Sequence, residues 1–159
     1  KDSINGVSDL CYDIVDVVAI NEYYGWYYGA DEDIGPKIDE IHKLYPDKPI
    51  VVSELGAGAA PDGNIERQKY HSRKNYALDH QCQHLEAHLK QIYDPARENY
   101  SMGAMIWVWA DFYDPHRIKS THPTAWKGVN LKGLLGLDRN KKPSYRTVKD
   151  FYEAVSQSR

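Results

Sequence analysis

The amino-acid sequence predicts an α/β fold, because short apolar runs alternate with helical patterns along the chain. The apolar runs are nearly continuous, which is typical of strands buried on both faces of a parallel sheet. Between them, apolar residues recur at the three- and four-residue spacing of helices. Strand and helix alternate three times, which is the order expected of an α/β protein. The expected strands are residues 14–21, 49–54 and 102–111, and the expected helices are residues 34–44, 66–92 and 144–155.

The residues within each predicted element support this assignment. Valine and isoleucine dominate the first two strands, which end in the polar pairs Asn21-Glu22 and Ser53-Glu54. Pro36 lies near the start of the first helix and Pro46 lies just past its end, two positions where proline is common. The apolar stripes that we expect the three helices to bury are Ile34, Ile38, Ile41 and Leu44; Leu78, Cys82, Leu85, Leu89 and Ile92; and Tyr145, Val148, Tyr152 and Val155.

Length and charge exclude several classes of protein. The chain has 159 residues, enough for one domain with a core, and its 20 basic and 23 acidic residues give a net charge of −3. Proteins that bind nucleic acids or anionic membranes are normally basic, so we expect neither partner. No run of about 18 apolar residues predicts a membrane span. The sequence starts at Lys1 without a signal-peptide pattern, which indicates a piece of a longer protein.

Aromatic residues are frequent and clustered. The chain has 13 Tyr, 4 Trp and 2 Phe, and five of them fall within residues 23–28, while Trp107 and Trp109 form a pair. Exposed aromatic side chains with hydroxyls stack on sugar rings, whereas buried ones are ordinary core residues, and composition alone favours the core. Residues 113–128 are predicted to form a long loop after the third strand, a place where functional residues gather.

Glu54 is the strongest candidate for chemistry. It lies at the carboxyl end of a buried strand, where α/β proteins place their active sites. Gly56 and Gly58 follow it, which would let a substrate approach closely, so the carboxylate suits a nucleophile or a base. A carboxylate that caps the following loop is the alternative. Asp111, Asp114, His116 and Arg117 flank the end of the third strand and are candidates to line the same pocket.

Four motifs in order resemble a known family. They are NEYYGWY at residues 21–27, KPIVVSELGA at residues 48–57, IWVWADF at residues 106–112 and NLKG at residues 130–133. Together they resemble the C-terminal part of the catalytic (β/α)8 barrel of glycoside hydrolase family 2, which includes β-glucuronidases and β-galactosidases. Three units are too few to close such a barrel, which takes about 250 residues. The resemblance therefore implies a partial TIM barrel over residues 1–159, with the sixth, seventh and eighth strands.

The resemblance implies a retaining glycosidase with two carboxyl groups about 5–5.5 Å apart. Glu54 matches the nucleophile, and Tyr23 matches a tyrosine whose hydroxyl donates a hydrogen bond to it. Asn21 is expected to contact the sugar. Trp107 and Trp109 are two residues apart on the expected third strand, so alternation places them on one face, which is expected to point into the barrel. Trp109, nearer the end of the strand, is the expected sugar platform, and Trp107 is expected to be a core residue.

The acid/base residue is expected to be missing. In this family it follows an asparagine at the end of the fourth strand, which this chain does not contain. Glu22 follows Asn21 but matches a variable position of the sixth-strand motif, and alternation points it away from Tyr23. Loss of a general acid removes about 10²–10⁴ in rate, so the isolated chain is expected to hydrolyse nothing efficiently. A non-catalytic carbohydrate-binding or assembly module is the alternative.

The sugar specificity stays open at this point. Asn130 and Lys132 resemble the pair with which β-glucuronidases bind the carboxylate of the sugar, and an ammonium with an amide donor suits a buried carboxylate. β-Galactosidase relatives have a similar run, and Lys132 could also be an ordinary loop lysine. The substrate is therefore expected to be a β-glucuronide or a β-galactoside.

No metal or other cofactor is expected. His80, His84 and His88 recur every four residues, a spacing that can bind zinc, but they lie opposite the apolar stripe and should form a solvated face. Residues 138–142 (DRNKK) are expected to form a solvated turn before the last helix. A partial barrel exposes an unpaired strand edge and interior side chains. We therefore expect it to bind the N-terminal remainder of a barrel, or to self-associate in its absence.

Overall fold

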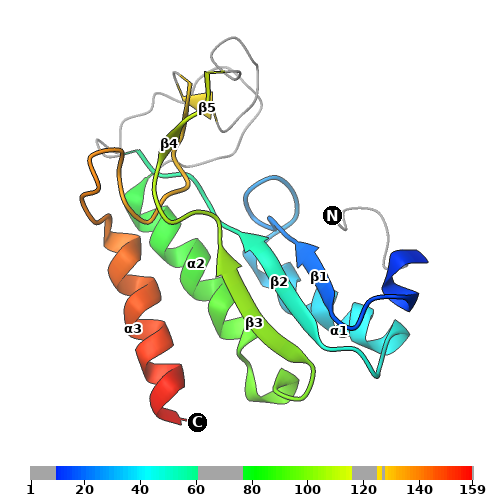
Figure 1. The fold of residues 1–159 in the computed structure, drawn as a ribbon. Coiled ribbons are helices and arrows are strands. Elements are labelled where there is room, and N and C mark those ends of the chain that lie inside the picture. Colours follow the sequence, from blue (N-terminus) through cyan, green and yellow to red (C-terminus); the bar gives the residue numbers. More distant parts are fainter. Residues whose placement is uncertain (1–9, 61–76, 116–124, 127, 159) are drawn as a thin grey trace. The chain divides into compact units, whose positions relative to one another are not determined.

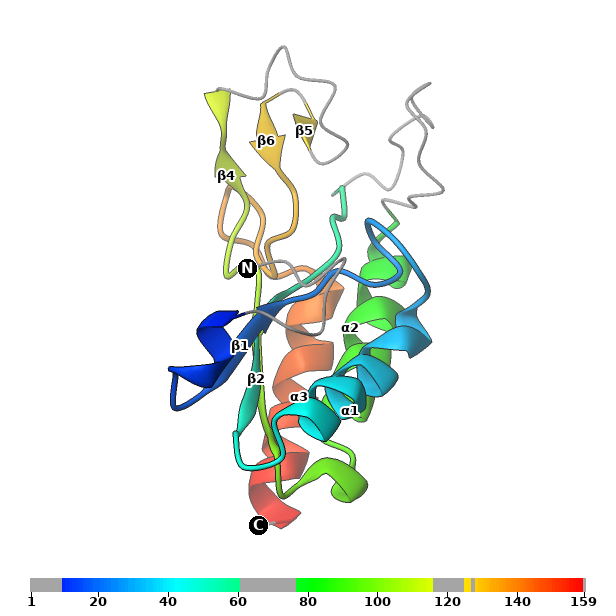
Figure 2. The same ribbon diagram turned by 90° about the vertical axis from the view of Figure 1, so that its right-hand side faces the viewer.

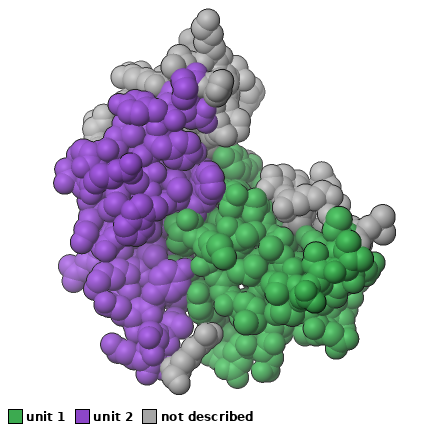
Figure 3. Space-filling model, in the orientation of Figure 1, with its two compact units in different colours: residues 1–55, 87–106 green, residues 56–86, 107–159 purple. Residues whose placement is uncertain are grey.

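The structure is a computed structural model that describes residues 10–60, 77–115, 125–126 and 128–158 (Figure 1). The chain divides into two compact units, of which unit 1 comprises residues 1–55 and 87–106 and unit 2 comprises residues 56–86 and 107–159 (Figure 3). None of the described helices is both long and apolar enough to cross a bilayer. The elements are η1 (Leu10–Asp13), β1 (Val18–Asn21), η2 (Asp31–Asp33), α1 (Ile34–Leu44), β2 (Ile50–Leu55), α2 (Leu78–Ile92), η3 (Pro95–Arg97), β3 (Ser101–Ile106), β4 (Phe112–Tyr113), β5 (Ala125–Trp126), β6 (Val129–Asn130) and α3 (Pro143–Ser158).

Unit 1 contains the predicted parallel sheet. Its strands lie in the order β1-β2-β3, and both pairings are parallel, with Val18 opposite Ile50 and Ile50 opposite Ser101. The α/β class is confirmed, and the described strands close no barrel. Two predicted boundaries are wrong: β1 begins at Val18 instead of Ile14, and β3 ends at Ile106 instead of Asp111. Ile14 is 83% exposed, so its β-propensity has no neighbouring strand to pack against.

One face of this sheet is covered by helices. Figure 2 shows α1 and the C-terminal part of α2 lying along one face of the sheet. Every second residue of β1 and β2 is buried, with Val18, Ile20, Ile50 and Val52 at most 1% exposed, as alternation predicts for strands covered on one face. The Gly35 N–H donates to the Gln91 side chain over 3.1 Å and joins the two helices. On α1 the buried stripe ends at Ile41, since Leu44 at its last position is 52% exposed.

Helix α2 buries Leu85, Leu89 and Ile92 of the predicted stripe, while Leu78 and Cys82 are only half-buried, and it also buries polar residues. Its fully buried positions follow helical spacing, with the apolar Leu85, Leu89 and Ile92 accompanied by the polar Gln81, His84 and His88. The expected solvated face is therefore wrong for His84 and His88, which are 0% exposed. Histidine counts as polar in a sequence pattern but is often buried in folded proteins. Helix α2 begins at Leu78, because Ala77 is not helical, and residues 66–76 of the predicted helix lie outside the described part.

Unit 2 contains a small antiparallel sheet in the order β4-β6-β5. Its strands lie within and directly beside the stretch 113–128 that was predicted to be a long loop, with Phe112 opposite Asn130 and Ala125 opposite the same residue on the other side. The expected loop thus contains Tyr113 of β4 and all of β5, and both strands pair with β6, the central strand. Within α3 only Ser144 and Val148 are buried, while Tyr145, Tyr152 and Val155 are half-exposed, so the predicted stripe is only partly covered.

Candidate active site

The carboxyl ends of β1 and β2 lie side by side in unit 1. Asn21 is the register partner of Glu54, and the Glu22 N–H donates to the Glu54 carbonyl oxygen over 2.9 Å. Parallel strands bring their carboxyl ends to the same edge of a sheet, which is why residues more than thirty positions apart meet here. The polar residues that terminate the two strands are thereby gathered at one place.

The Glu54 carboxylate accepts a hydrogen bond from Tyr23. The Tyr23 hydroxyl lies 2.8 Å from Glu54 Oε2, and the Tyr23 ring is only 7% exposed. The Tyr27 ring packs edge-on against it with centroids 5.1 Å apart, which orients the phenol. A half-exposed carboxylate at the end of a strand, oriented by a hydrogen bond, can act as a nucleophile or a base.

Asn21 is positioned by the neighbouring strand. Its side-chain oxygen accepts a hydrogen bond from the Ser53 hydroxyl over 2.8 Å, and the residue is half-buried. A hydrogen bond to the amide oxygen also fixes the direction of the amide NH2 group, because both belong to one planar amide. Asn21, Tyr23 and Glu54 therefore lie close together at the carboxyl ends of β1 and β2.

Glu22 has a separate environment. It is 0% exposed, and its Oε2 accepts a hydrogen bond from the Tyr28 hydroxyl over 2.8 Å. Burial, together with the hydrogen bond to Glu22, raises the pKa of Tyr28. Burial and the nearby Glu22 charge also raise the pKa of Tyr24 to about 12. Glu22 is thus held within the aromatic turn of residues 23–28, while the adjacent Tyr23 side chain reaches Glu54.

Asn130 and Lys132 lie together in unit 2. The Asn130 side-chain oxygen accepts from the Lys132 N–H over 3.0 Å, and Lys132 Nζ donates to the Gly56 carbonyl oxygen over 2.9 Å. Both residues are buried, at 3% and 2% exposure. Gly56 does not leave room for a substrate as expected, because a Cβ there would collide with the carbonyl oxygen of Trp107.

The two tryptophans do not lie on a strand as predicted. The backbone after β3 bonds instead to the segment around Lys132: the Val108 N–H donates to the Lys132 carbonyl and the Leu134 N–H donates to the Val108 carbonyl. Strand alternation therefore does not apply to Trp107 and Trp109. Trp109 is 61% exposed, with its ring 5.9 Å from that of Tyr145, and Trp107 is half-buried beside Phe112.

The sequence did not predict the environment of three buried polar side chains of unit 2. Gln81 donates to the Ala57 carbonyl over 2.8 Å and to the Gly133 carbonyl over 3.2 Å, and it accepts from the Ser144 hydroxyl. Asp111 was only a candidate pocket residue, and Lys142 was assigned to a solvated turn, yet they form an ion pair of 2.8 Å. Asp114 is half-exposed, and His116 and Arg117 lie outside the described residues. The sequence does give one indication that Gln81 is buried. It lies three residues after Leu78 and four before Leu85, which places it on the same face of the helix as these apolar residues.

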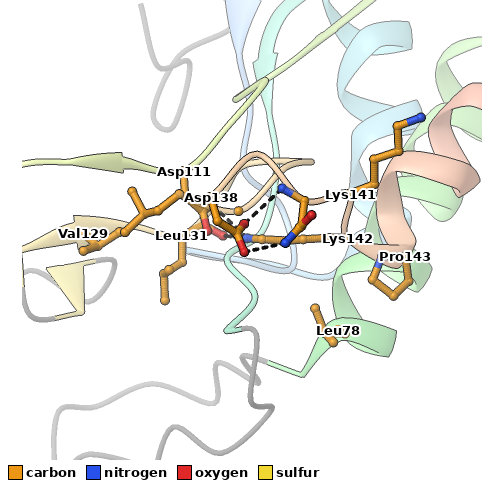
Figure 4. A pocket seen from close by; sticks show the side chains of 11 residues that line it. Leu78, Asp111, Val129, Leu131, Asp138, Lys141, Lys142 and Pro143 are labelled. Atoms are coloured by element: carbon orange, nitrogen blue, oxygen red, sulfur yellow. Dashed lines mark hydrogen bonds and ion pairs between the residues drawn. The ribbon is translucent and has the colours of Figure 1, made fainter.

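A cavity of about 380 Å³ lies beside this ion pair (Figure 4). Asp111 and Lys142 line it together with the apolar side chains of Leu78, Val129 and Leu131. All its lining residues belong to unit 2, and the exposed turn that contains Asp138 forms part of its rim.

Parallel strands joined by helices, with polar residues at their carboxyl ends, are the arrangement expected of part of a β/α barrel. A model of the family described as glycosyl hydrolases family 2, TIM barrel domain, matches residues 3–157. The chain therefore belongs to glycosyl hydrolase family 2 and represents part of its TIM barrel.

Curated relatives and solved structures agree with this family. A β-glucuronidase of Streptococcus agalactiae is 32% identical over 151 residues, which cover 90% of this chain and 22% of that protein. The mouse β-glucuronidase is 31% identical over 154 residues, which cover 94% of this chain and 22% of that protein. A β-galacturonidase from Eisenbergiella tayi, solved with galacturonate, has a TM-score of 0.72 at 27% identity, covering 93% of this chain and 26% of that one. The chain thus spans about a fifth of the length of these curated relatives.

Proposed function

We propose that this chain carries the nucleophile of a retaining β-glycosidase that acts on β-glucuronides. Glu54 attacks the anomeric carbon of the sugar, and the bond to the aglycone oxygen breaks as that oxygen takes a proton from a carboxylic acid. Water activated by the same acid/base residue then hydrolyses the glycosyl–Glu54 ester and releases the sugar with retained configuration. The observation that carries this proposal is the 2.8 Å hydrogen bond from Tyr23 to Glu54 at the end of the middle strand of the sheet.

The substrate class rests on Asn130 and Lys132 together with the relatives. The curated relatives named above are β-glucuronidases, and the solved neighbour from Eisenbergiella tayi was bound to galacturonate, so uronic acids recur among them. An ammonium is the natural partner for the carboxylate that distinguishes a uronic acid from a neutral sugar. Lys132 Nζ donates to the Gly56 carbonyl here, so a substrate carboxylate would share this ammonium with that carbonyl.

The second carboxylic acid is proposed to come from outside these 159 residues. Glu22 is the adjacent acid, but its buried carboxylate is bonded to Tyr28, and it serves that aromatic turn. A general acid must reach the leaving oxygen, so a carboxylate held in this way is a poor candidate. We expect Trp109, with its exposed ring, to provide a sugar-stacking surface and Trp107 to support it.

Covalent trapping tests the proposed nucleophile. The product of the complete reading frame that contains this sequence is incubated with 2-deoxy-2-fluoro-β-D-glucuronyl fluoride, whose fluoride leaves without protonation, so the trap does not need the acid residue. Peptide mass spectrometry is expected to find the fluoroglucuronyl group on Glu54. An adduct on another carboxylate, or hydrolysis of glucuronides with no adduct at Glu54, would overturn the assignment.

One face of the sheet in unit 1 carries exposed apolar side chains, which supports a partner that covers it. On β3, Met102 and Met105 are 58% and 61% exposed, and β1 and β3 each leave one edge unpaired among the described residues. In a barrel, the remaining β/α units would cover such a face and pair with both edges. We propose that the N-terminal remainder of a barrel does so here.

The isolated 159-residue chain is therefore expected to differ from the complete protein in two ways. It should hydrolyse an aryl β-glucuronide at least about 10²-fold more slowly, since it lacks the general acid. It should also self-associate through its uncovered sheet face, which light scattering would detect as a mass above that of one chain. Efficient turnover that Glu54→Gln abolishes would refute the first expectation, and a cooperatively unfolding monomer would refute the second.

A further inference from the structure

The buried ion pair of unit 2 bonds mainly to backbone. Lys142 Nζ has three hydrogen bonds: to Asp111 Oδ1 over 2.8 Å, to the Leu131 carbonyl over 2.9 Å and to the Ala59 carbonyl over 2.9 Å. An ammonium has three donors, so these partners use its full capacity. The side chains of Lys142 and Asp111 are only 5% and 1% exposed, which removes both charges from solvent.

The ion pair is hydrogen-bonded to the backbone of the residues before and after Lys132. Asp111 Oδ1 accepts from the Gly133 N–H over 2.8 Å, so the carboxylate binds the residue after Lys132 while the ammonium binds the residue before it. Gly133 lies directly against the backbone of residues 110–111, because a Cβ at this position would collide with Asp111 N and with the carbonyl carbon of Ala110. The two charged groups thus fix the backbone on both sides of the lysine that we propose binds the sugar carboxylate.

Stability alone does not explain this arrangement. Burial raises the pKa of Asp111 and lowers the pKa of Lys142, so each group depends on the other to stay charged. Asp111 Oδ2 is buried and has no hydrogen-bond partner within the described part of the chain, which is a further cost. Apolar side chains of similar volume are often as stabilising as a buried ion pair. What apolar side chains cannot do is hold the Leu131 carbonyl and the Gly133 N–H at defined positions.

We propose that Asp111 and Lys142 are positioning residues that set the Asn130–Lys132 segment for the carboxylate of a uronic-acid substrate. The inference rests on the proposed function, because it assigns these residues to the specificity of that reaction. Neither residue needs to touch the substrate. Their effect passes through the backbone to Lys132, whose N–H is also bonded by the Asn130 side chain. A displacement of a binding group by about 1 Å can cost about 10² in rate, so such a role has a measurable signature.

The test compares two substrates that differ only at C6. The complete reading-frame product is assayed with 4-nitrophenyl β-D-glucuronide and with 4-nitrophenyl β-D-glucoside, which has a hydroxymethyl group in place of the carboxylate. The variants are Lys142→Met and the double variant Asp111→Asn/Lys142→Met, which leaves no uncompensated charge and keeps an acceptor for the Gly133 N–H. Lys149→Met, which removes a half-exposed lysine of α3, is the matched control.

Both variants are expected to lower the glucuronide-to-glucoside ratio of kcat/KM by about 10–10²-fold, mainly through a higher KM for the glucuronide, while Lys149→Met leaves it unchanged. A purely structural role would lower both activities alike and leave the ratio within twofold, which would overturn the proposal. Because Lys142→Met strands a buried carboxylate and can unfold the protein, the double variant decides the outcome. A double variant that does not fold by circular dichroism would show that the pair acts through stability, and would also overturn it.

Failure of the proposed function gives a different result. If the unsubstituted protein turns over neither substrate, or prefers the glucoside, the assignment of a uronic-acid substrate is wrong before any variant is considered. If it prefers the glucuronide and the folded double variant keeps that preference, only the positioning role is wrong.

Discussion

Glu54→Gln is expected to lower kcat for an aryl β-glucuronide by about 10⁴–10⁶-fold in the complete reading-frame product, which is the scale seen when a nucleophile is removed. Glutamine keeps the size of the side chain and can still accept a hydrogen bond from the Tyr23 hydroxyl, which lies 2.8 Å from Glu54 Oε2. It cannot form the glycosyl ester, because a neutral amide is a poor nucleophile. Steady-state kinetics with 4-nitrophenyl β-D-glucuronide measures the loss.

Two further variants serve as a control and a comparison for the loss of kcat in Glu54→Gln. Glu40→Gln replaces an exposed acid on α1 of the same unit and should leave kcat unchanged. Tyr23→Phe removes only the hydrogen bond to the carboxylate and should have a smaller effect than Glu54→Gln. If the Glu54→Gln protein kept its turnover, another residue would be the nucleophile. If the unsubstituted protein bound a sugar without any turnover and Glu54→Gln left that binding unchanged, a non-catalytic binding module would be the better description.

Lys132→Ala is expected to lower kcat/KM for the glucuronide by about 10²–10³-fold, because removing one partner of a desolvated charge pair costs about 2–5 kcal/mol. The glucoside and galactoside lack the carboxylate, so their kcat/KM should change by much less. The control is Lys141→Ala, a neighbouring lysine of unit 2 that is exposed and lies over the Tyr145 ring.

The competing interpretations of Lys132 predict different changes in activity toward the glucuronide and the galactoside. If the galactoside were the better substrate and lost as much activity as the glucuronide, the enzyme would belong with β-galactosidases, and Lys132 would hold the loop through the Gly56 carbonyl. If Lys132→Ala changed no substrate by more than twofold, Lys132 would be an ordinary loop lysine. Thermal unfolding of each variant separates these outcomes from a loss of folded protein.

The sheet and the helices of unit 1 could be predicted because their signals are local. The apolar runs around Ile20 and Val52 and the stripe of α1 are periodic over short windows, and burial follows from that periodicity. Residues 107–111 have the same apolar composition as a strand, yet their backbone bonds to residues 132–135. A partner more than twenty residues away leaves no trace in the local pattern, so the end of β3 was placed five residues too late.

The candidate site was predictable where strand ends determine it and unpredictable where buried polar groups do. Tyr23 and Glu54 meet because β1 and β2 are adjacent and parallel. Lys142 was expected in a solvated turn, since it ends a run of polar residues, four of which are indeed exposed. It is buried because backbone carbonyls from two other segments and the Asp111 carboxylate surround its ammonium. Such acceptors become apparent only after the chain has folded.

The central place of β2 in its sheet has a practical consequence. Both neighbours of the strand that bears Glu54, and the tyrosine that bonds to it, come from the same stretch of polypeptide. A cut in the chain before β1 would therefore keep the proposed attacking group and its phenol donor on one polypeptide. Under the proposed function, turnover would then require that polypeptide to associate with the one that supplies the proton, so an enzyme divided in this way would report the association.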